Sequence, residues 1–400
     1  MADAKVLELI EKLISFDTTS RESNLELIEF IRGYLGNLGV ESILVPNDEG
    51  TKANLFATVG DPGTPGIMLS GHTDVVPVDG QSWDTAPFTV TEKSGRLYGR
   101  GTSDMKSFIA ITLAKLPEFM DRGLKTPLHL AFSYDEEVGC IGVRRLIDKV
   151  NSFPVKPAMC IVGEPTNMEV VVGHKGKRSY IARVRGLEAH SSLAPDGVNA
   201  VEYAAELITH MRGMAQRIAV SGPHDPLYDI THTTVHTGIV GGGTALNIVP
   251  KDCRIDFEFR YVGDDDPESI EREIYDYANK VLEPEMKAVS ADTGIDIECV
   301  NDMPGLDIGA EEEVVTFVKA LAGRNDHAKV AFGTEAGLFE KRGGIPAVVC
   351  GPGAIAQAHK PNEYIEISQI EECEVFFSRL MDRVCATPWP CENSRSDRWI

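Results

Sequence analysis

Acidic and histidine side chains stand at four equivalent places in the sequence, each directly after an apolar segment or at the start of the next helix. These groups are His72-Thr73-Asp74, Asp104, Glu136-Glu137 and Glu164. Far downstream, the apolar segment Pro346–Cys350 is followed by a glycine-rich turn and then by His359. In open α/β sheets the carboxyl ends of the strands form the ligand crevice. We therefore expect these side chains to converge on one cleft.

The carboxylates of this set need a counter-charge. Together they would place up to five negative charges in one cleft, and like charges that close cannot all stay ionised without opposing charge. Two divalent metal ions supply four positive charges, and the two histidines add neutral nitrogen ligands. A mixed nitrogen and oxygen ligand set favours zinc or a neighbouring first-row metal over calcium or magnesium. We expect two zinc ions, with cobalt or manganese as substitutes.

Each group alone has an ordinary structural explanation. Asp104 stands where a helix begins, which is a common place for a capping residue. A pair such as Glu136-Glu137 usually lies in a solvated turn, and Glu164 and His359 could be loop residues without a function. Five such groups at corresponding positions of one predicted sheet are much harder to explain in this way. The combined pattern favours a metal site.

The segments between these groups predict the elements that position them. Short, nearly continuous apolar strands alternate with helices, which is typical of a mostly parallel α/β sheet with helices on both faces. The predicted strands are residues 41–45, 54–59, 67–70, 128–134 and 158–162, and the predicted helices are residues 3–15, 24–38 and 105–120. The same alternation returns after Glu311 and ends with a helix near residues 370–384.

The middle of the chain follows a different order. A strand at residues 178–184, a helix at 198–214, strands at 233–240 and 253–261, a helix at 267–281 and a strand at 295–300 give the order β-α-β-β-α-β. This is the order of a split βαβ, or ferredoxin-like, unit. We predict a discontinuous domain of residues 1–175 and 302–400, interrupted by a smaller domain of residues 176–301.

Composition excludes several classes of partner. Lys and Arg number 39 against 61 Asp and Glu, so the formal net charge of −22 would repel nucleic-acid phosphates. No apolar run approaches the roughly 20 residues of a membrane span. The apolar residues near the N-terminus are spaced as on one face of a helix, unlike the uninterrupted apolar segment of a signal peptide. The eight cysteines form no Cys-x-x-Cys pair, and Cys160 and Cys350 lie in apolar runs typical of buried thiols. A cytoplasmic protein is predicted.

Two long motifs carry a resemblance to a known family. The segments Ser70–Val78 (SGHTDVVPV) and Tyr98–Lys106 (YGRGTSDMK) resemble the signatures of a di-zinc amidohydrolase and peptidase family. Its members include acetylornithine deacetylase, succinyl-diaminopimelate desuccinylase, aminoacylase and glutamate carboxypeptidase. Agreement covers roughly residues 5–385 and continues through residues 135–137, 163–166, 189–192, 247–250, 333–336 and 351–364. Residues 77–83, 333–336 and 359–364 are most similar to acetylornithine deacetylase.

The resemblance implies a ligand set for two zinc ions. His72 and Glu164 would bind one ion, Glu137 and His359 would bind the other, and Asp104 would bridge the two. In this family, a glutamate at the position of Glu164 is associated with deacylases and carboxypeptidases rather than with aminopeptidases.

The resemblance also implies how the ligands and the attacking water are controlled. Asp74 would accept a hydrogen bond from the far ring nitrogen of His72 and so fix its tautomer. Glu136 would be the general base that deprotonates a metal-bridging water and later passes the proton to the leaving amine.

For the predicted inserted domain, the resemblance implies a lid and a dimer interface. His190 would donate a hydrogen bond to the developing oxyanion, often across that interface, so we expect a homodimer formed through this domain. Asn247 and Arg260 would hold the carboxylate of the substrate, because a guanidinium can grip a carboxylate with two hydrogen bonds. A surface salt bridge is the alternative for Arg260. Further candidates for substrate contacts are Lys175, Thr334 and Glu335, of which the last could attract an ornithine ammonium or support the site.

The expected activity is metal-dependent removal of the acyl group from an N-acyl amino acid. N-acetyl-L-ornithine is the expected substrate, with L-ornithine and acetate as products, which is a step of arginine biosynthesis. The alternatives on the same scaffold are a carboxypeptidase or dipeptidase, a succinyl-diaminopimelate desuccinylase and an N-carbamoyl amino acid hydrolase. A non-catalytic binding relative is the remaining alternative, but every implied metal ligand and the implied base are present.

Overall fold

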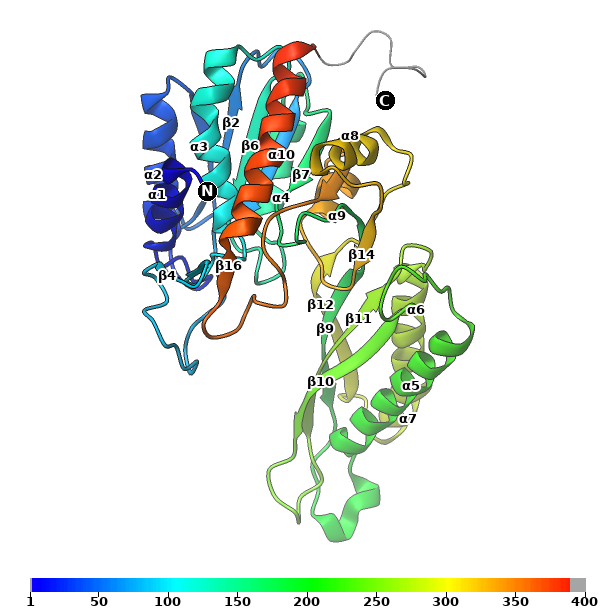
Figure 1. Ribbon diagram of the computed structural model, residues 1–400. Coiled ribbons are helices and arrows are strands. Elements are labelled where there is room, and N and C mark those ends of the chain that lie inside the picture. The colour runs from blue at the N-terminus through cyan, green and yellow to red at the C-terminus, as the bar shows by residue number, and fades with distance from the viewer. Residues whose placement is uncertain (1, 389–400) are drawn as a thin grey trace. The chain divides into compact units, whose positions relative to one another are not determined.

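The computed structural model describes residues 2–388 of the 400-residue chain. The chain divides into two compact units (Figure 1). The first unit contains the residues up to Gly173, Leu306–Lys329 and the residues from Thr334 onward, and the second contains His174–Gly305 and Val330–Gly333. These junctions lie a few residues from the predicted limits at 175 and 302, and the roles predicted for the two domains stay predictions. Most of the tail beyond residue 387, Cys391 included, lies outside the described residues.

A large sheet with a parallel centre forms the frame of the first unit. Its strands are β1 (Ser42–Pro46), β2 (Ala53–Val59), β3 (Ile67–His72), β6 (Leu128–Ser133), β7 (Met159–Val162), β8 (Val171–His174), β13 (Leu306–Asp307), β14 (Ala328–Val330) and β15 (Ala347–Val349). Within the described residues the strand order is β1-β2-β6-β3-β7-β15-β8-β13, and β14 pairs with β8. The central strands β6, β3, β7 and β15 run parallel, whereas β2 is antiparallel to both of its neighbours.

Helices cover both faces of this sheet. They are α1 (Ala4–Ile14), α2 (Leu25–Asn37), α3 (Lys106–Arg122), α4 (Val143–Asn151), α8 (Glu313–Ala322), α9 (Ala336–Lys341) and α10 (Ile367–Ala386). Leu55, Leu69 and Ile161 share one core cluster with α1, α2, α3, α8 and α10. Phe56 points to the other face, where its ring lies 5.1 Å from that of Phe153 just after α4. None of the helices in residues 2–388 is long and apolar enough to cross a membrane.

A second, small sheet joins two distant loops of the first unit. It consists of β4 (Thr91–Lys93), β5 (Arg96–Tyr98) and β16 (Tyr364–Glu366), in the order β16-β5-β4. Tyr364 pairs with Tyr98 in an antiparallel register. The residues just before β16 therefore lie beside the loop that follows β5.

The second unit is a two-layer α/β unit. Its elements are β9 (Gly176–Arg185), α5 (Ala200–Ser221), β10 (Thr234–Gly242), β11 (Asp252–Tyr261), α6 (Pro267–Tyr277), α7 (Glu283–Val289) and β12 (Gly294–Met303). The sheet order is β10-β11-β9-β12, with antiparallel neighbours, and the helices contribute to one core cluster with it. This is the ferredoxin-like order that the sequence predicted.

The predicted fold class is confirmed, but one predicted helix is divided. The sequence pattern predicted a helix over residues 267–281, whereas α6 ends at Tyr277, a π turn spans Ala278–Leu282 and α7 follows. Pro284 lies two residues after the π turn, and because proline has no backbone N–H it cannot donate to a carbonyl group of that turn. Cys160 and Cys350 are buried free thiols, as predicted.

Gly163, which lies between β7 and Glu164, allows α3 to approach the sheet closely. A Cβ atom at this position would lie only 2.1 Å from the Phe108 ring. We expect Gly163→Ala to lower the free energy of unfolding by about 1–3 kcal/mol, as overpacking of a core does. Gly33 of α2 has no atom within 4 Å of such a Cβ, so Gly33→Ala should raise that free energy by about 0.5–1 kcal/mol. Urea denaturation of both variants and of the wild type measures these free energies of unfolding. A Gly163→Ala variant as stable as the wild type would contradict the close packing of Gly163 against Phe108.

Candidate active site

The four central strands of the first unit end beside one another, and predicted site residues follow these ends. His72 is the last residue of β3, Glu136-Glu137 follow β6, and Glu164 follows β7. A loop leads from β15 to His359, and Asp104 lies between β5 and α3. Because β6, β3, β7 and β15 are neighbours in this order, their carboxyl ends bring these residues to one edge of the sheet.

Asp104 lies between the two histidines. Its Oδ1 is 3.0 Å from Nε2 of His72, and its Oδ2 is 3.3 Å from Nε2 of His359. The Asp104 side chain is also buried. A carboxylate that offers one oxygen to each of two ligand nitrogens has the arrangement needed to lie between two metal ions.

Glutamates complete the cluster on both sides of Asp104. Nε2 of His72 is 3.6 Å from Oε1 of Glu164, and Nε2 of His359 is 3.0 Å from Oε2 of Glu137. Two sets have ligand atoms that all lie within 4.8 Å of one another: His72 with Glu136 and Glu164, and His72 with Asp104 and Glu137. The structure thus brings the predicted ligands together, and their division between two metal ions stays a prediction.

Burial makes the cluster unfavourable without a counter-charge. It raises the pKa of Glu164 to about 7 and the pKa of Glu136 well above its ordinary value. Oε1 of Glu164 is buried and has no hydrogen-bond partner within residues 2–388. Hydrogen bonds with Asp104 and Glu137 raise the pKa of His359 to about 10. These residues fit divalent cations, which would neutralise the carboxylates and take nitrogen ligands from the histidines.

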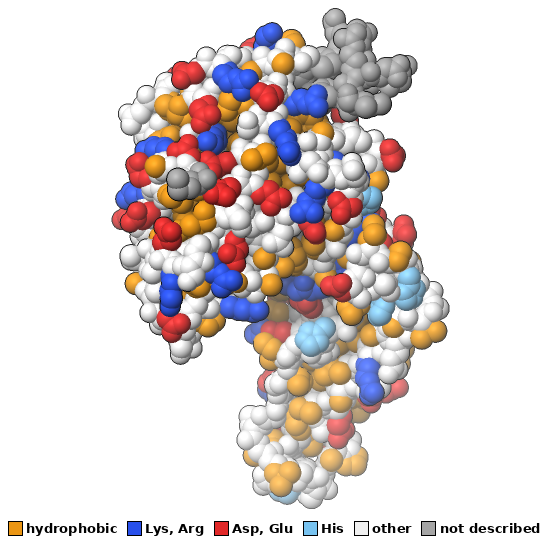
Figure 2. Space-filling model, viewed as in Figure 1, with side chains coloured by type: hydrophobic (Ala, Val, Ile, Leu, Met, Phe, Trp, Pro, Cys, Tyr) orange, Lys and Arg blue, Asp and Glu red, His pale blue; other side chains and the backbone are white. Residues whose placement is uncertain are grey.

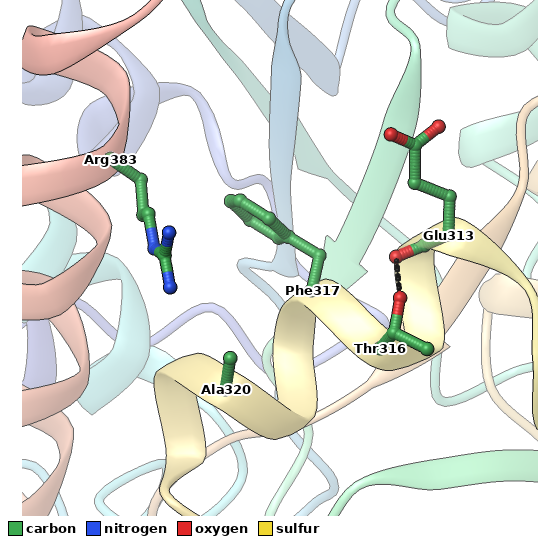
Figure 3. Close-up of a pocket in the computed structure, with 5 residues that line it drawn as sticks. All are labelled: Glu313, Thr316, Phe317, Ala320 and Arg383. Atoms are coloured by element: carbon green, nitrogen blue, oxygen red, sulfur yellow. Dashed lines mark hydrogen bonds between the residues drawn. The ribbon is translucent and has the colours of Figure 1, made fainter. Parts of the chain in front are cut away.

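The visible face of the first unit (Figure 2) and the cavity between α8 and α10 show no second cluster of acidic and histidine side chains. Figure 2 shows basic and acidic side chains interspersed over the visible face of the first unit. The cavity between α8 and α10 in Figure 3 has a volume of about 20 Å³, and Phe317 and Arg383 are among its lining residues. A cavity of this size holds about one water molecule, so it is no substrate site.

Asp74 anchors the turn that carries the predicted base. Its Oδ1 accepts the N–H of Glu136 at 3.1 Å, and its Oδ2 accepts the N–H of Glu137 at 3.3 Å and the hydroxyl of Ser20 at 2.7 Å. Nδ1 of His72 lies 2.9 Å from the backbone oxygen of Asp74 but 3.6 Å from its Oδ1. The main chain of Asp74 is therefore the closer partner of His72, because the carboxylate expected there is turned toward the two glutamate amides.

Several side chains that support the site were missed at the sequence level. Lys52 forms an ion pair with Asp135, at 2.5 Å, on the same turn that Ser20 helps to hold. The thiol of Cys140 donates to Oε1 of Glu136 at 3.3 Å. Ser20 and Lys52 come from segments outside every motif, so only the folded chain reveals them. Cys140 stands four residues after Glu136, and this proximity was the one available signal.

Thr334 and Glu335 are buried at the start of α9. Oγ1 of Thr334 accepts the N–H of Ala336 at 3.1 Å, and the hydroxyl of Ser70 donates to Oε2 of Glu335 at 3.4 Å. Burial raises the pKa of Glu335 to about 7. These contacts favour a supporting role for both residues, and their contact with a substrate stays a prediction.

The other predicted substrate residues belong to the second unit. His190 and Asn247 are exposed, whereas Lys175 is buried and its Nζ donates to a backbone oxygen at 2.6 Å. Nε of Arg260 donates to Oε1 of Glu258 at 2.9 Å, so the salt bridge named as the alternative for Arg260 is present. The roles of these four candidates stay predictions.

Comparisons with known proteins show what this chain is similar to in sequence and in fold. The sequence profile of peptidase family M20/M25/M40 matches residues 68–383. An acetylornithine deacetylase from Proteus mirabilis is 33% identical over 388 residues, which cover 95% of this chain and 96% of that relative. An M20 family metallo-carboxypeptidase from Sulfolobus solfataricus has a TM-score of 0.74 at 20% identity, covering 96% of this chain and 100% of that one. A dinuclear metal-binding M20 peptidase from Bacillus subtilis has a TM-score of 0.61 at 14% identity, covering 96% and 99%.

Replacement of Ser20 tests whether Asp74 supports the cluster of predicted metal ligands. We expect Ser20→Ala to weaken zinc binding by roughly tenfold, the lower end of the effect typical of groups that orient metal ligands, because Asp74 loses its hydroxyl donor. Competition with a chromophoric chelator measures the affinity. Ser23→Ala is the matched control, because Ser23 is exposed and its hydroxyl donates to the backbone oxygen of Thr51. An equal loss in both variants, or no loss in either, would contradict the role of Ser20.

Proposed function

The chain belongs to peptidase family M20/M25/M40, and on that premise we propose that it hydrolyses the amide bond of an N-acyl amino acid. The proposed substrate is N-acetyl-L-ornithine, and the products are L-ornithine and acetate. The observation that carries the chemistry is Asp104, whose two carboxylate oxygens lie 3.0 and 3.3 Å from two histidines beside three buried or partly buried glutamates. The identity of 33% to an acetylornithine deacetylase supports the choice of substrate.

Two zinc ions are part of the proposal, with cobalt or manganese as substitutes. His72 and Glu164 would hold one ion, Glu137 and His359 would hold the other, and Asp104 would be shared. Ions held there would lower the pKa of water and polarise the carbonyl of the substrate. The protein's own contribution is to fix the ligands before the substrate arrives, as the contacts of Asp74 with the turn of Glu136-Glu137 indicate.

Glu136 is the proposed general base. Burial and the nearby charge of Glu164 raise its pKa well above the ordinary value, which suits a group that must take up a proton near neutral pH. Its Oε1 accepts the Cys140 thiol at 3.3 Å, so Oε2 is the atom that we assign to hold the proton of the attacking water. The same atom would then deliver the proton to the nitrogen of the leaving amine.

The second unit would supply the remaining contacts with the substrate. His190 would donate to the carbonyl oxygen as negative charge develops there. Asn247 and Arg260 would bind the α-carboxylate, and because the ion pair with Glu258 uses Nε of Arg260, its two terminal nitrogens are the proposed donors. A homodimer formed through this unit and a cytoplasmic location complete the proposal.

Hydrolysis of a peptide bond next to a free carboxylate is the second candidate. It is favoured by the similarity in fold to the metallo-carboxypeptidase from Sulfolobus solfataricus. A desuccinylase of succinyl-diaminopimelate and an N-carbamoyl amino acid hydrolase would use the same ligand set, because all these reactions attack a carbonyl carbon that bears nitrogen.

Acetate release from N-acetyl-L-ornithine tests the proposed substrate. We expect release to stop after chelation, to return with zinc, and to be faster than release of the acyl group from N-acetylmethionine or N-succinyl-diaminopimelate. Purified protein is assayed before chelation, after it and after zinc restoration. The absence of acetate release from protein that holds about two metal ions per chain would contradict the proposed substrate. Cleavage of dipeptides by that same protein would establish the second candidate.

Replacement of Glu136 by glutamine tests the assignment of the base. Glu136→Gln keeps the size and the Cys140 contact but cannot hold the proton, so we expect kcat to fall by about 10²- to 10⁴-fold, the usual contribution of a general base. Metal content should remain that of the wild type, as measured by elemental analysis. Glu29→Gln on the exposed face of α2 is the control and should change neither quantity. Undiminished turnover in Glu136→Gln would assign the proton transfer to another group.

A further inference from the structure

Glu363 is a buried carboxylate that none of the roles above uses. It immediately precedes β16, in the segment that joins His359 to that strand, and its side chain is 1% exposed. Its hydrogen bonds reach the loop that carries Asp104, which lies 259 residues earlier in the chain. One residue therefore touches two segments that both carry implied metal ligands.

The backbone of the Asp104 loop is bound to Glu363 along its length. Oε1 of Glu363 accepts the N–H groups of Gly101 at 3.0 Å, Ser103 at 2.9 Å and Asp104 at 3.1 Å. The backbone oxygen of Glu363 accepts a fourth N–H, that of Gly99, at 3.0 Å. Hydrogen bonds to an ionised carboxylate are about twice as strong as neutral ones, and successive N–H groups form a cradle for negative charge.

Arg100 extends this connection to His359. Its Nη1 lies 2.6 Å from Oε2 of Glu363, and both side chains are buried. Its Nη2 donates to Oε1 of Gln81 at 2.7 Å, and Nε2 of Gln81 donates to the backbone oxygen of His359 at 3.2 Å. The two ligand-bearing segments are thus linked through Glu363, Arg100 and Gln81 as well as through the pairing of β16 with β5.

We propose that Glu363 is a positioning residue that fixes the carboxylate of Asp104 between His72 and His359 by holding the backbone of the loop before it. The proposal rests on the metal-dependent function proposed above. Asp104 is the residue in the cluster that faces both histidines, so a displacement of its main chain changes the ligand geometry on both sides at once. If only the side-chain rotamer of Asp104 were fixed, a shift of its main chain would still move the carboxylate relative to both histidines.

The hydroxyl of Ser103 also holds this loop to a distant segment, because it donates to Ala354 O at 3.1 Å and accepts the N–H of Ala354 at 3.2 Å. These contacts use the Ser103 side chain and leave the loop amides to other partners. Within residues 2–388, the N–H of Thr102 donates to Gly99 O at 3.2 Å and the N–H of Lys106 donates to Gly101 O at 2.9 Å. Both bonds lie inside the loop and its helix, so they shape it locally. The Glu363 carboxylate is what binds the amides of Ser103 and Asp104 to a different part of the first unit.

Two variants separate positioning from general stability. Glu363→Ala removes every acceptor of the side chain, and Glu363→Gln keeps one oxygen but loses the charge and the ion pair with Arg100. In metal-free protein, we expect hydrogen exchange of the peptide containing residues 101–104 to accelerate at least about tenfold in Glu363→Ala and less in Glu363→Gln, while exchange in the central strands stays unchanged. Mass spectrometry of peptic fragments reports both regions.

Metal binding provides the second readout, independent of turnover. We expect the zinc dissociation constants to rise by about ten- to a hundredfold in Glu363→Ala, as is typical when a group that orients a metal ligand is lost. Glu366→Gln is the matched control, because Glu366 ends β16, just after Glu363 in the chain, and forms a partly exposed ion pair with Arg96 at 2.8 Å. This control should keep wild-type exchange at residues 101–104 and wild-type zinc affinity.

Several outcomes would overturn the proposal. Folded variants with wild-type exchange at residues 101–104 and wild-type zinc affinity would show that Glu363 positions nothing. Uniformly faster exchange with unchanged zinc affinity would reduce Glu363 to a stabilising residue, and loss of the folded state in both variants would make it a folding requirement instead. Wild-type protein that binds no zinc would refute the proposed function itself, which is a different result from variants that match a zinc-binding wild type.

Discussion

Repulsion among closely spaced, buried or partly buried carboxylates governs how the first unit is built. Asp104, Glu136, Glu137 and Glu164 meet where the central parallel strands end, and burial raises the pKa of Glu164 to about 7. Such a cluster persists only if cations or protons neutralise it and if the backbone behind it cannot move apart. The sheet provides that backing, because β6, β3, β7 and β15 are adjacent, parallel and covered by helices on both faces.

Two carboxylates outside the cluster use the same device to hold it. Asp74 accepts the amides of Glu136 and Glu137, and Glu363 accepts the amides of Gly101, Ser103 and Asp104. In both cases a buried acid binds the backbone of a loop that carries a predicted metal ligand. It makes these bonds without using the side chain of that ligand. The acids of this site therefore divide into those that face the histidines and those that hold the loops from behind. The second kind needs no metal, because peptide N–H groups supply the positive end of the interaction.

The fold class and the residues at the sheet edge could both be predicted from the sequence. An apolar strand followed directly by polar residues is a local pattern that can be recognised without the structure. The strands β4, β5 and β16 have only three residues each and were not predicted, since so short a segment shows no periodicity. Glu363 stood in a recognised motif, yet its side-chain contacts join residues 259 to 263 positions apart. Contacts between residues this far apart in the chain follow from tertiary packing. The same is true of the hydrogen bond between the ring of His72 and the backbone oxygen, rather than the carboxylate, of Asp74.

The discontinuity of the first unit has a consequence for the chain as it leaves the ribosome. β3, β6 and β7 are made early, but Glu363 follows Glu164 by 199 residues, with the whole second unit between them. At the usual 5–20 residues per second, synthesis of that stretch takes roughly 10–40 s. During this interval His72, Glu136 and Glu164 exist without β15, His359 and the brace of the Asp104 loop. Completion of the proposed metal site would therefore be a late event of biosynthesis, set by the distance in sequence between the two halves of one sheet.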